Sequence, residues 1–321
     1  MANETKTKAK KKRTKAQNSD RRRHTLQAIW AFVSNSYLLG FFEGKIYQGK
    51  LKTLCVPGLN CYSCPGALGS CPIGAMQAVI GSRNHKFAFY VSGFLIFIGA
   101  LCGRLVCGFL CPFGFLQDLL HKIPFPKKIK TFKGDKLLRY FKYVVLLVFV
   151  ILLPLFVVDF MGQGAPYFCK LICPAGMLEG GVPLSILDET IRDTVGFLFA
   201  WKGVILAVTV FLSILIYRPF CKYICPLGAI YSVFNPISLY HYSIDKDKCT
   251  DCGACAKVCK MGVDPRKTPN SLECIRCGLC KDICPEGAIH ADVSLKNDAY
   301  KAPKKSFTKS SVPTSIDDKT N

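Results

Sequence analysis

The sequence predicts a mainly α-helical protein, in which a four-helix transmembrane core built from two internal repeats precedes a small α+β domain. Three observations predict this class. Long apolar runs recur along the 321-residue chain, of which 50% is hydrophobic, and the mean hydropathy is +0.25. The motif Cys-Pro-x-Gly occurs four times among these runs. Two dense cysteine runs follow them, so a membrane region precedes a separate cysteine-rich domain.

The apolar runs approach the length of about 20 residues that a helix needs to cross a bilayer. They cover residues 25–42, 87–106, 143–160 and 195–217. The first run is the weakest, because Gln27 and the polar residues 34–36 interrupt it. A buried helix of a soluble protein is the alternative for each run. The transmembrane core is therefore expected within residues 25–240.

The formal net charge of +22 is spread unevenly. Residues 1–24 are too rich in lysine and arginine to bury a core and are expected to be a disordered basic tail, as are residues 293–321. Residues 121–142 carry eight lysines and arginines, whereas the loop between the third and fourth runs has only Lys170 and Arg192. The positive-inside rule then predicts a multi-pass protein of the cell membrane with both termini in the cytoplasm. Beside a membrane, the basic tail is expected to contact lipid and no nucleic acid.

Residues 241–292 contain two runs with the spacing Cys-x2-Cys-x2-Cys-x3-Cys, which is typical of a bacterial-type 2[4Fe–4S] ferredoxin domain. In this spacing three thiolates of one run hold one cluster, and the fourth cysteine reaches the other cluster. Zinc is the main alternative, but zinc sites do not need this eightfold pattern. The first cluster is expected to bind Cys249, Cys252, Cys255 and Cys284. The second is expected to bind Cys274, Cys277, Cys280 and Cys259.

The Cys-Pro-x-Gly motifs predict further clusters, up to four in the whole chain. Three of the motifs have a cysteine four residues earlier, and the expected topology assigns two motifs to each face of the membrane. The inner-face set is Cys107, Cys111, Cys221 and Cys225. The outer-face set is Cys64, Cys71, Cys169 and Cys173, with Cys61 as a substitute ligand. Disulfides are the alternative outside the membrane, and a different metal is the alternative inside.

The stretches NCYSCPGALGSCPIGAMQ, CGFLCPFGFLQ and CKYICPLGA, with the closing cysteine runs, resemble the polyferredoxin-like membrane proteins. This family includes NapH-type quinol dehydrogenase subunits and the C-terminal portion of NosR-type regulators. The resemblance covers residues 21–290 and implies a four-helix membrane core, cytoplasmic clusters and electron exchange with a quinone pool or a redox protein. The chain has no evident counterpart of the NosR-type flavin-binding domain. Its motif at Cys169 goes beyond the two-motif pattern of NapH-type subunits.

These features favour an iron–sulfur protein that relays electrons between a cytoplasmic donor or acceptor and a quinone or an outer-face redox partner. An acidic ferredoxin or flavodoxin, or a membrane reductase subunit, would suit the basic inner face. The alternatives are an assembly or maturation factor and a redox-sensing regulator for a metalloenzyme. No catalytic residues are evident, so the chain is expected to be an electron-transfer subunit, and a quinol dehydrogenase-type activity stays open. Because the two faces are about 30 Å apart, a further carrier between them is expected.

Overall fold

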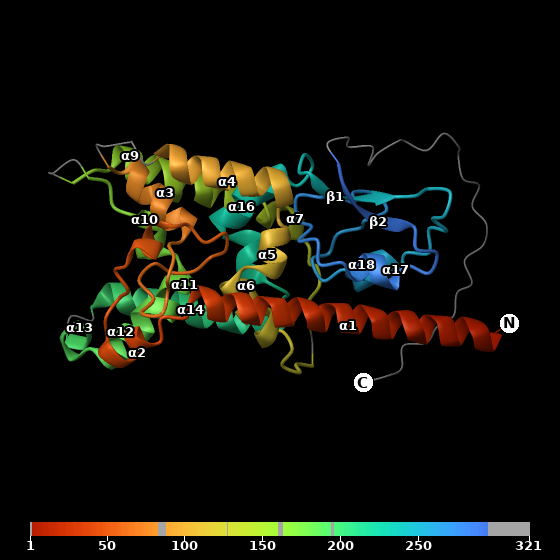
Figure 1. Ribbon diagram of the computed structural model, residues 1–321, viewed down its shortest axis with the longest axis horizontal. Coiled ribbons are helices and arrows are strands. Elements are labelled where there is room, and N and C mark those ends of the chain that lie inside the picture. Colours follow the sequence, from red (N-terminus) through yellow and green to blue (C-terminus); the bar gives the residue numbers. More distant parts are fainter. Residues whose placement is uncertain (1, 83–87, 127, 160–162, 194–195, 295–321) are drawn as a thin grey trace.

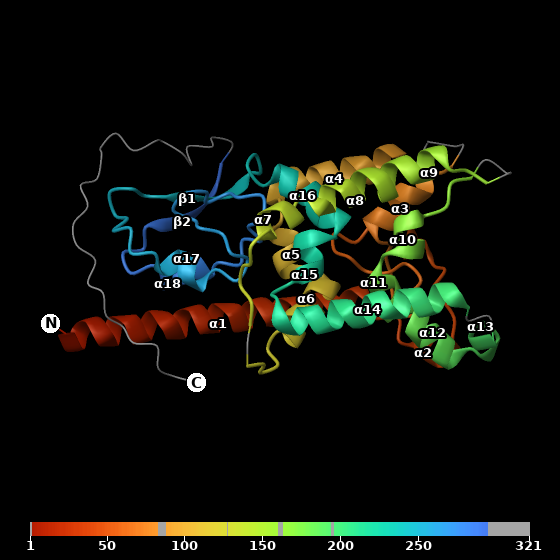
Figure 2. The same ribbon diagram turned by 180° about the vertical axis from the view of Figure 1, so that it is seen from behind.

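The structure is a computed structural model that describes residues 2–82, 88–126, 128–159, 163–193 and 196–294. The molecule is elongated (Figures 1 and 2), with the C-terminal region at one end and the helices α2 (Leu39–Glu43) and α13 (Glu189–Asp193) at the other. Long helical segments run along this axis. They are α1 (Ala2–Ser34), α4 (Ala88–Cys102), α14 (Phe197–Leu215), and a segment made of α7 (Asp135–Leu138), α8 (Phe141–Val145), the π-helix η3 (Leu146–Leu152) and α9 (Leu153–Phe156).

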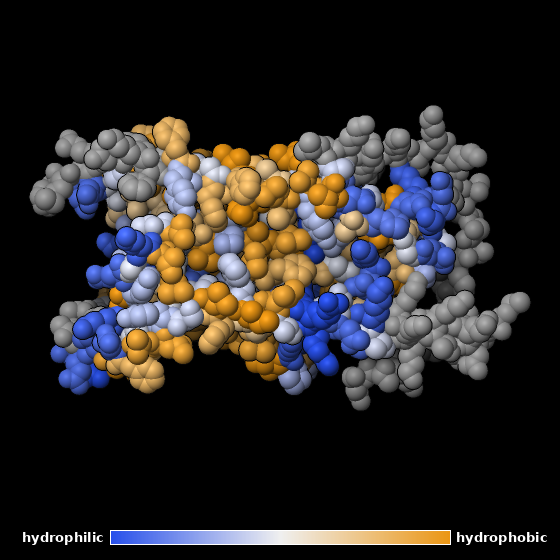
Figure 3. All heavy atoms as spheres, viewed as in Figure 1, coloured by the Kyte–Doolittle hydropathy of each residue, from blue (hydrophilic) through white to orange (hydrophobic). Residues whose placement is uncertain are grey.

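Two helices among the described residues are long and apolar enough to cross a membrane, Asp135–Phe156 and Phe197–Leu215. The apolar part of α4, Phe89–Cys102, is shorter. Large apolar side chains are exposed on these helices, among them Phe89, Phe97, Leu147, Phe156, Val204 and Phe211. Figure 3 shows the resulting apolar belt between two hydrophilic ends. An exposed apolar surface of this kind marks contact with lipid or with another protein.

Helix α1 differs from the disordered tail predicted for residues 1–24, because the structure has one helix over Ala2–Ser34. The segment is rich in alanine, lysine and arginine, which are strong helix formers. It packs along α6 (Pro112–Leu120) and α18 (Leu279–Ile283), so tertiary contacts reinforce the local propensity. The first apolar run is divided, because α1 ends at Ser34 and the chain turns before α2 begins.

Each of the four Cys-Pro-x-Gly motifs that precede the C-terminal unit starts a short helix at its proline. Proline is favourable at the first helical position because it lacks an N–H that would go unpaired there. These helices are α3 (Pro72–Ile80), α6, α11 (Pro174–Gly176) and α16 (Pro226–Phe234). Three of them follow another short helix, namely α5 (Leu105–Phe109), α10 (Tyr167–Leu171) and α15 (Pro219–Tyr223). The two cysteines of such a motif therefore flank one bend between two helices. Three further helices are η1 (Lys50–Thr53), the π-helix η4 (Met177–Gly181) and α12 (Val182–Leu187).

The C-terminal region is the small α+β unit that the sequence predicts. Strands β1 (Tyr240–Ile244) and β2 (Ile289–Val293) pair antiparallel, and the helices α17 (Ala254–Val258) and α18 lie between them in the chain. Gly253 and Gly278 begin these helices with φ of 72° and 84°, a backbone conformation that glycine adopts without steric cost. Its Ile275 belongs to the same buried cluster as Leu59 and Val145, so the helical region and the C-terminal unit share one hydrophobic core.

Candidate metal centre

The eight cysteines of the C-terminal region line two separate cavities. One cavity is lined by Cys249, Cys252, Cys255 and Cys284. The other is lined by Cys259, Cys274, Cys277 and Cys280. Each cavity combines three cysteines of one run with the fourth cysteine of the other run, which is the grouping that the spacing predicts. Cys252 is exposed, so the first cavity lies at the protein surface.

The predicted inner-face cysteines also meet. Cys107, Cys111, Cys221 and Cys225 line one cavity between α5, α6, α15 and α16. The backbone N–H of Gly114 donates to Cys111 Sγ, and that of Gly228 donates to Cys225 Sγ, both at 3.3 Å. Both amides lie in the first turn of a helix begun by a motif proline. The helix N-termini therefore face sulfur atoms, an arrangement that stabilises thiolates.

The lining of the outer-face cavity, which has a volume of about 560 Å³, differs from the prediction by one residue. Its cysteines are Cys61, Cys71, Cys169 and Cys173. Cys64, which the sequence assigns to this set, does not line the cavity but is buried nearby, where its N–H donates to the carbonyl oxygen of Cys61. The turn between these two residues separates their side chains. The residue predicted as a substitute ligand is therefore the one that the fold brings to the other three.

The donor chemistry of these cavities fits [4Fe–4S] clusters, because each is lined by four cysteines and a cubane binds four thiolates. No disulfide forms among the 19 cysteines, all of which the structure describes. In the described ranges no three Cys, His, Asp or Glu side chains converge as they would on a single metal ion. Burial raises the pKa of Cys61 and Cys71 to about 12, so these thiols need a bound cation in order to ionise at neutral pH.

The inner and outer cavities adjoin one another. Leu59 lines both of them, although it belongs to the loop that leads to the outer motif. This loop reaches the end of α5, where a Cβ added at Gly58 would lie 2.6 Å from the carbonyl oxygen of Leu110. On the other side, Tyr231 donates a hydrogen bond of 3.1 Å to the carbonyl oxygen of Pro57. One residue therefore separates two sites that the sequence alone puts on opposite faces of a bilayer.

The inner cavity also adjoins the C-terminal unit. Gly108, next to Cys107, packs so closely that an added Cβ would lie 2.5 Å from the carbonyl oxygen of Ile275. Ile275 lines the second C-terminal cavity together with Cys274 and Cys277. The second C-terminal, inner and outer cavities thus follow one another through these contacts. Each of α17 and α18 carries a cysteine of one C-terminal cavity and is followed directly by a cysteine of the other.

Two buried arginines bind the inner site across the repeats, and the sequence reasoning missed both. Arg104 Nη2 donates to the carbonyl oxygen of Cys221 at 3.0 Å, and Arg218 Nη1 donates to that of Cys107 at 2.5 Å. Each arginine comes three residues before the first cysteine of its own motif. The shared pattern Arg-x-x-Cys-x3-Cys-Pro-x-Gly is the signal that could have identified them.

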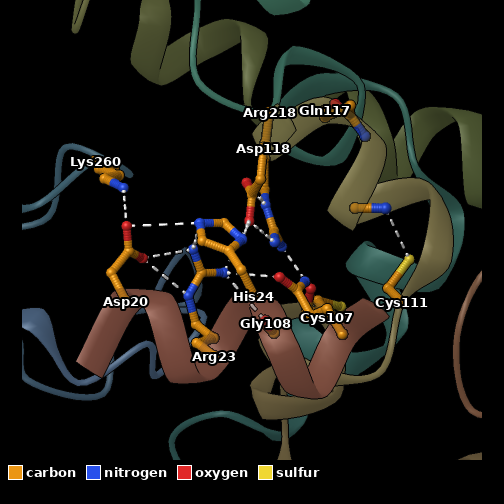
Figure 4. Close-up of polar contacts among 12 residues, drawn as sticks. Asp20, Arg23, His24, Cys107, Gly108, Cys111, Gln117, Asp118, Arg218 and Lys260 are labelled. Atoms are coloured by element: carbon orange, nitrogen blue, oxygen red, sulfur yellow. Dashed lines mark hydrogen bonds and ion pairs between the residues drawn. The ribbon is translucent and has the colours of Figure 1, made fainter. Parts of the chain in front are cut away.

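A buried ion network connects α1 to the inner site (Figure 4). Asp118 binds Arg218 at 2.6 Å and Arg23 at 2.8 Å. Burial alone would raise the pKa of Asp118, but Arg218 and then Arg23 outweigh it and hold that pKa well below its usual range. Asp20, also on α1, binds Arg23 and Lys260, each at 2.8 Å. Because Lys260 follows a cysteine of the second C-terminal cavity, the network joins both sites.

A second network joins the C-terminal unit to the membrane helices. Glu273, beside Cys274, binds Arg104 at 2.8 Å and Lys142 of α8 at 2.5 Å. Burial would raise the pKa of Glu273, but these two cations outweigh it and lower that pKa. The carboxylate is therefore held charged between the inner site and the second C-terminal cavity.

Two families described as 4Fe-4S binding domains match the chain. One matches residues 85–132 and 197–238, which contain the inner-face cysteines, and the other matches residues 242–263 and 268–290, which contain both C-terminal runs. The chain therefore binds [4Fe–4S] clusters. The cysteines of the outer cavity lie outside all matched ranges.

Several curated proteins are similar to the chain. The uncharacterized protein MJ0749 of Methanocaldococcus jannaschii is 29% identical over 212 residues, which are 63% of this chain and 70% of that protein. The putative electron transport protein YccM of Escherichia coli is 28% identical over 201 residues, or 59% of this chain and 51% of YccM. The regulatory protein NosR of Stutzerimonas stutzeri is 29% identical over 181 residues, or 54% of this chain and 22% of NosR. No solved structure matches the chain.

Proposed function

Because the chain carries the 4Fe–4S binding domains of the polyferredoxin-like membrane proteins, we propose that it is a membrane-bound electron relay. Electrons pass between a cytoplasmic donor or acceptor and a quinone or a redox partner at the outer face. One observation carries this proposal: four groups of four cysteines line four cavities. Three of these cavities follow one another through contacts at Ile275 and Leu59, and the two C-terminal cavities take their cysteines from the same helices, α17 and α18. The relative that is described as a putative electron transport protein supports it.

In this proposal each cavity holds one [4Fe–4S] cluster, which supplies one-electron chemistry when bound. The first two clusters bind the C-terminal cysteines in the grouping described above. The inner cluster binds Cys107, Cys111, Cys221 and Cys225. The outer cluster binds Cys61, Cys71, Cys169 and Cys173, with Cys61 in place of Cys64. The chain holds the thiolates, excludes water from them and fixes the charges beside them.

The electron path follows the contacts between cavities. It enters at the exposed Cys252, continues through the second C-terminal cavity, and reaches the inner site where Ile275 meets Gly108. From there Leu59 leads to the outer site. The shared wall at Leu59 means that no additional carrier is needed between the inner and outer clusters, in contrast to the expectation from bilayer thickness alone.

The proposed membrane core is residues 25–240, with the second half of α1 and α4 beside the two long apolar helices. The exposed apolar belt supports this core, since Leu26, Ile29 and Phe32 of α1 are more than half exposed. The ferredoxin-like domain, residues 241–292, lies in the cytoplasm with both termini, because residues 121–142 beside it carry eight basic residues. An acidic ferredoxin or flavodoxin suits this face.

Redox-monitored EPR of the anaerobically purified protein tests the proposal. Four distinct cluster signals are expected, and the Cys107→Ala/Cys221→Ala double variant is expected to lose one of them and about a quarter of its iron. Cys102→Ala is the matched control, since Cys102 lines none of the four cavities. Two signals in the wild-type protein, with iron unchanged in the double variant, would confine metal to the C-terminal domain and contradict the relay.

A redox-sensing regulator is the second candidate, favoured by the similarity to a protein that is described as regulatory. A sensor would bind its partner with different affinity in the oxidised and reduced states. A relay would instead be reoxidised by quinone or by an outer acceptor in isolated membranes, with many turnovers per molecule.

A further inference from the structure

The four Cys-Pro-x-Gly motifs share a position, six residues after the motif cysteine, that reaches across to the other repeat. In the first two motifs this residue is a buried glutamine, Gln77 and Gln117. Gln77 Nε2 lies 3.2 Å from Cys169 Sγ, and Gln117 Nε2 lies 3.2 Å from Cys221 Sγ. Each glutamine therefore follows one cysteine of a cavity and contacts a sulfur that the opposite repeat contributes to the same cavity.

The surroundings fix the orientation of the Gln77 amide. Gln77 Oε1 accepts a hydrogen bond of 3.0 Å from the backbone N–H of Phe168, so its NH₂ group is the one that faces Cys169. Gln117 Nε2 also donates to the carbonyl oxygen of Phe113, one turn earlier in α6. A thiolate has no proton and can only accept, so each contact is an N–H···S hydrogen bond from the amide to the sulfur.

We propose that Gln77 and Gln117 are positioning residues that set the reduction potentials of the outer and inner clusters, respectively. The inference rests on the proposed function, since it takes both cavities to hold clusters. A hydrogen bond to a ligand sulfur stabilises the more negative, reduced form and raises the reduction potential. Because both amides are buried, little solvent screens this effect.

The other two motifs show that this role is specific to the glutamines. Glu179 holds the same position in the third motif and accepts a hydrogen bond of 2.6 Å from the backbone N–H of Cys61. Tyr231 holds it in the fourth motif and donates to a backbone carbonyl. These two side chains bind main-chain atoms of the first loop. Each cavity therefore has one amide donor on a cysteine sulfur, and both donors come from the first repeat.

The test is an EPR-monitored redox titration of Gln117→Leu and Gln77→Leu in the full-length chain. Leucine retains most of the side-chain volume but cannot donate. Gln117→Leu is expected to lower the reduction potential of the inner cluster and leave that of the outer cluster unchanged. Gln77→Leu should lower the potential of the outer cluster and leave that of the inner cluster unchanged.

The EPR signal of the inner cluster is identified by its loss in Cys107→Ala/Cys221→Ala, and that of the outer cluster by its loss in Cys169→Ala/Cys173→Ala. Thr209→Val, which removes a buried hydroxyl that donates only within its own helix α14, to the carbonyl oxygen of Ile205, should shift neither potential.

The outcomes separate this inference from the proposed function. If the wild-type protein held no cluster in the inner and outer cavities, the proposed function would be contradicted. Core clusters whose potentials stay unchanged in both leucine variants would defeat the inference and leave the relay intact. Should a leucine variant lose its cluster, Gln117→Met and Gln77→Met, which are unbranched and equally unable to donate, are titrated instead. A lowered potential there supports the inference, whereas cluster loss in the methionine variants as well would show that the glutamines serve only assembly.

Discussion

Asp118 shows how single charges hold this site together. Its carboxylate is buried between Arg23 of α1 and Arg218, and Arg218 in turn holds the carbonyl oxygen of Cys107. Removing the charge would leave the buried guanidinium of Arg218 without its carboxylate partner and Arg23 with Asp20 alone, and uncompensated buried charge is among the most costly changes that a fold can undergo. The residue therefore links the stability of the fold to the geometry of the inner site.

Asp118→Asn is expected to lower the free energy of unfolding by about 3–5 kcal/mol, since it breaks a buried ion network. Thermal or denaturant unfolding in detergent would measure this. The control is Glu189→Gln, whose ion pair with Arg192 is exposed and should contribute less than about 1 kcal/mol. Equal effects of both variants would contradict the structural role of the network.

The same carboxylate predicts a pH dependence. Its pKa in the fold lies well below the value of about 4 expected in the unfolded chain. The stabilisation is therefore fully present above about pH 4 and is lost as the pH falls toward the pKa in the fold. The stability difference between wild type and Asp118→Asn should be constant near neutral pH and shrink below about pH 4. If the difference in stability between wild type and Asp118→Asn grew on acidification, it would contradict a lowered pKa of Asp118 in the fold.

Among the elements, the loop that carries Pro57, Gly58 and Leu59 decides whether the inner and outer cavities adjoin. It inserts between α5 and α16 and forms the wall shared by the inner and outer cavities. Close approach of this backbone to α5 requires a residue without a Cβ at Gly58. The loop thus brings an outer segment to an inner site.

Gly58→Ala is expected to slow electron transfer between the inner and outer clusters severalfold while both clusters remain bound. The added Cβ would lie 2.6 Å from Leu110 O and 2.9 Å from Cys111 Cα, so the loop must move away. Stopped-flow oxidation of the prereduced protein in proteoliposomes by a membrane-impermeant acceptor would measure the rate. Gly203→Ala on α14, with no atom within 4 Å of the new Cβ, is the control and should leave the rate unchanged. An unaltered rate in Gly58→Ala would mean that the loop is not the path.

At the scale of the whole molecule, helix α1 and two ion networks join the C-terminal unit to the helical core. Asp20 reaches Lys260, and Glu273 reaches both Arg104 and Lys142. These contacts, with the shared hydrophobic core, hold the cavities in fixed order. The hydrophilic ends and the apolar belt of Figure 3 suggest that this order runs along the membrane normal.

An even number of crossings predicts that both termini lie on the same side. Tags fused to the N- and C-termini should both be digested by protease in inside-out vesicles and both be protected in right-side-out vesicles. Extraction should require detergent, because the apolar belt would otherwise meet water. Protection of one terminus only would imply an odd number of spans and would contradict the four-helix core.

The sequence by itself determined the features that depend on local spacing. Short loops with cysteines three residues apart fix the grouping of the C-terminal ligands, and apolar runs of sufficient length predict helices in lipid.

The tertiary structure alone decided which residues meet across the two repeats. Only packing selects Cys61 over Cys64, brings Leu59 to the inner site and aims Gln117 at Cys221. Packing also stabilises the basic N-terminal segment as helix α1, because Asp20 forms an ion pair with Lys260 and Arg23 forms one with Asp118. The physical reason is that long-range contacts depend on how helices pack, and no local pattern of residues encodes that packing by itself.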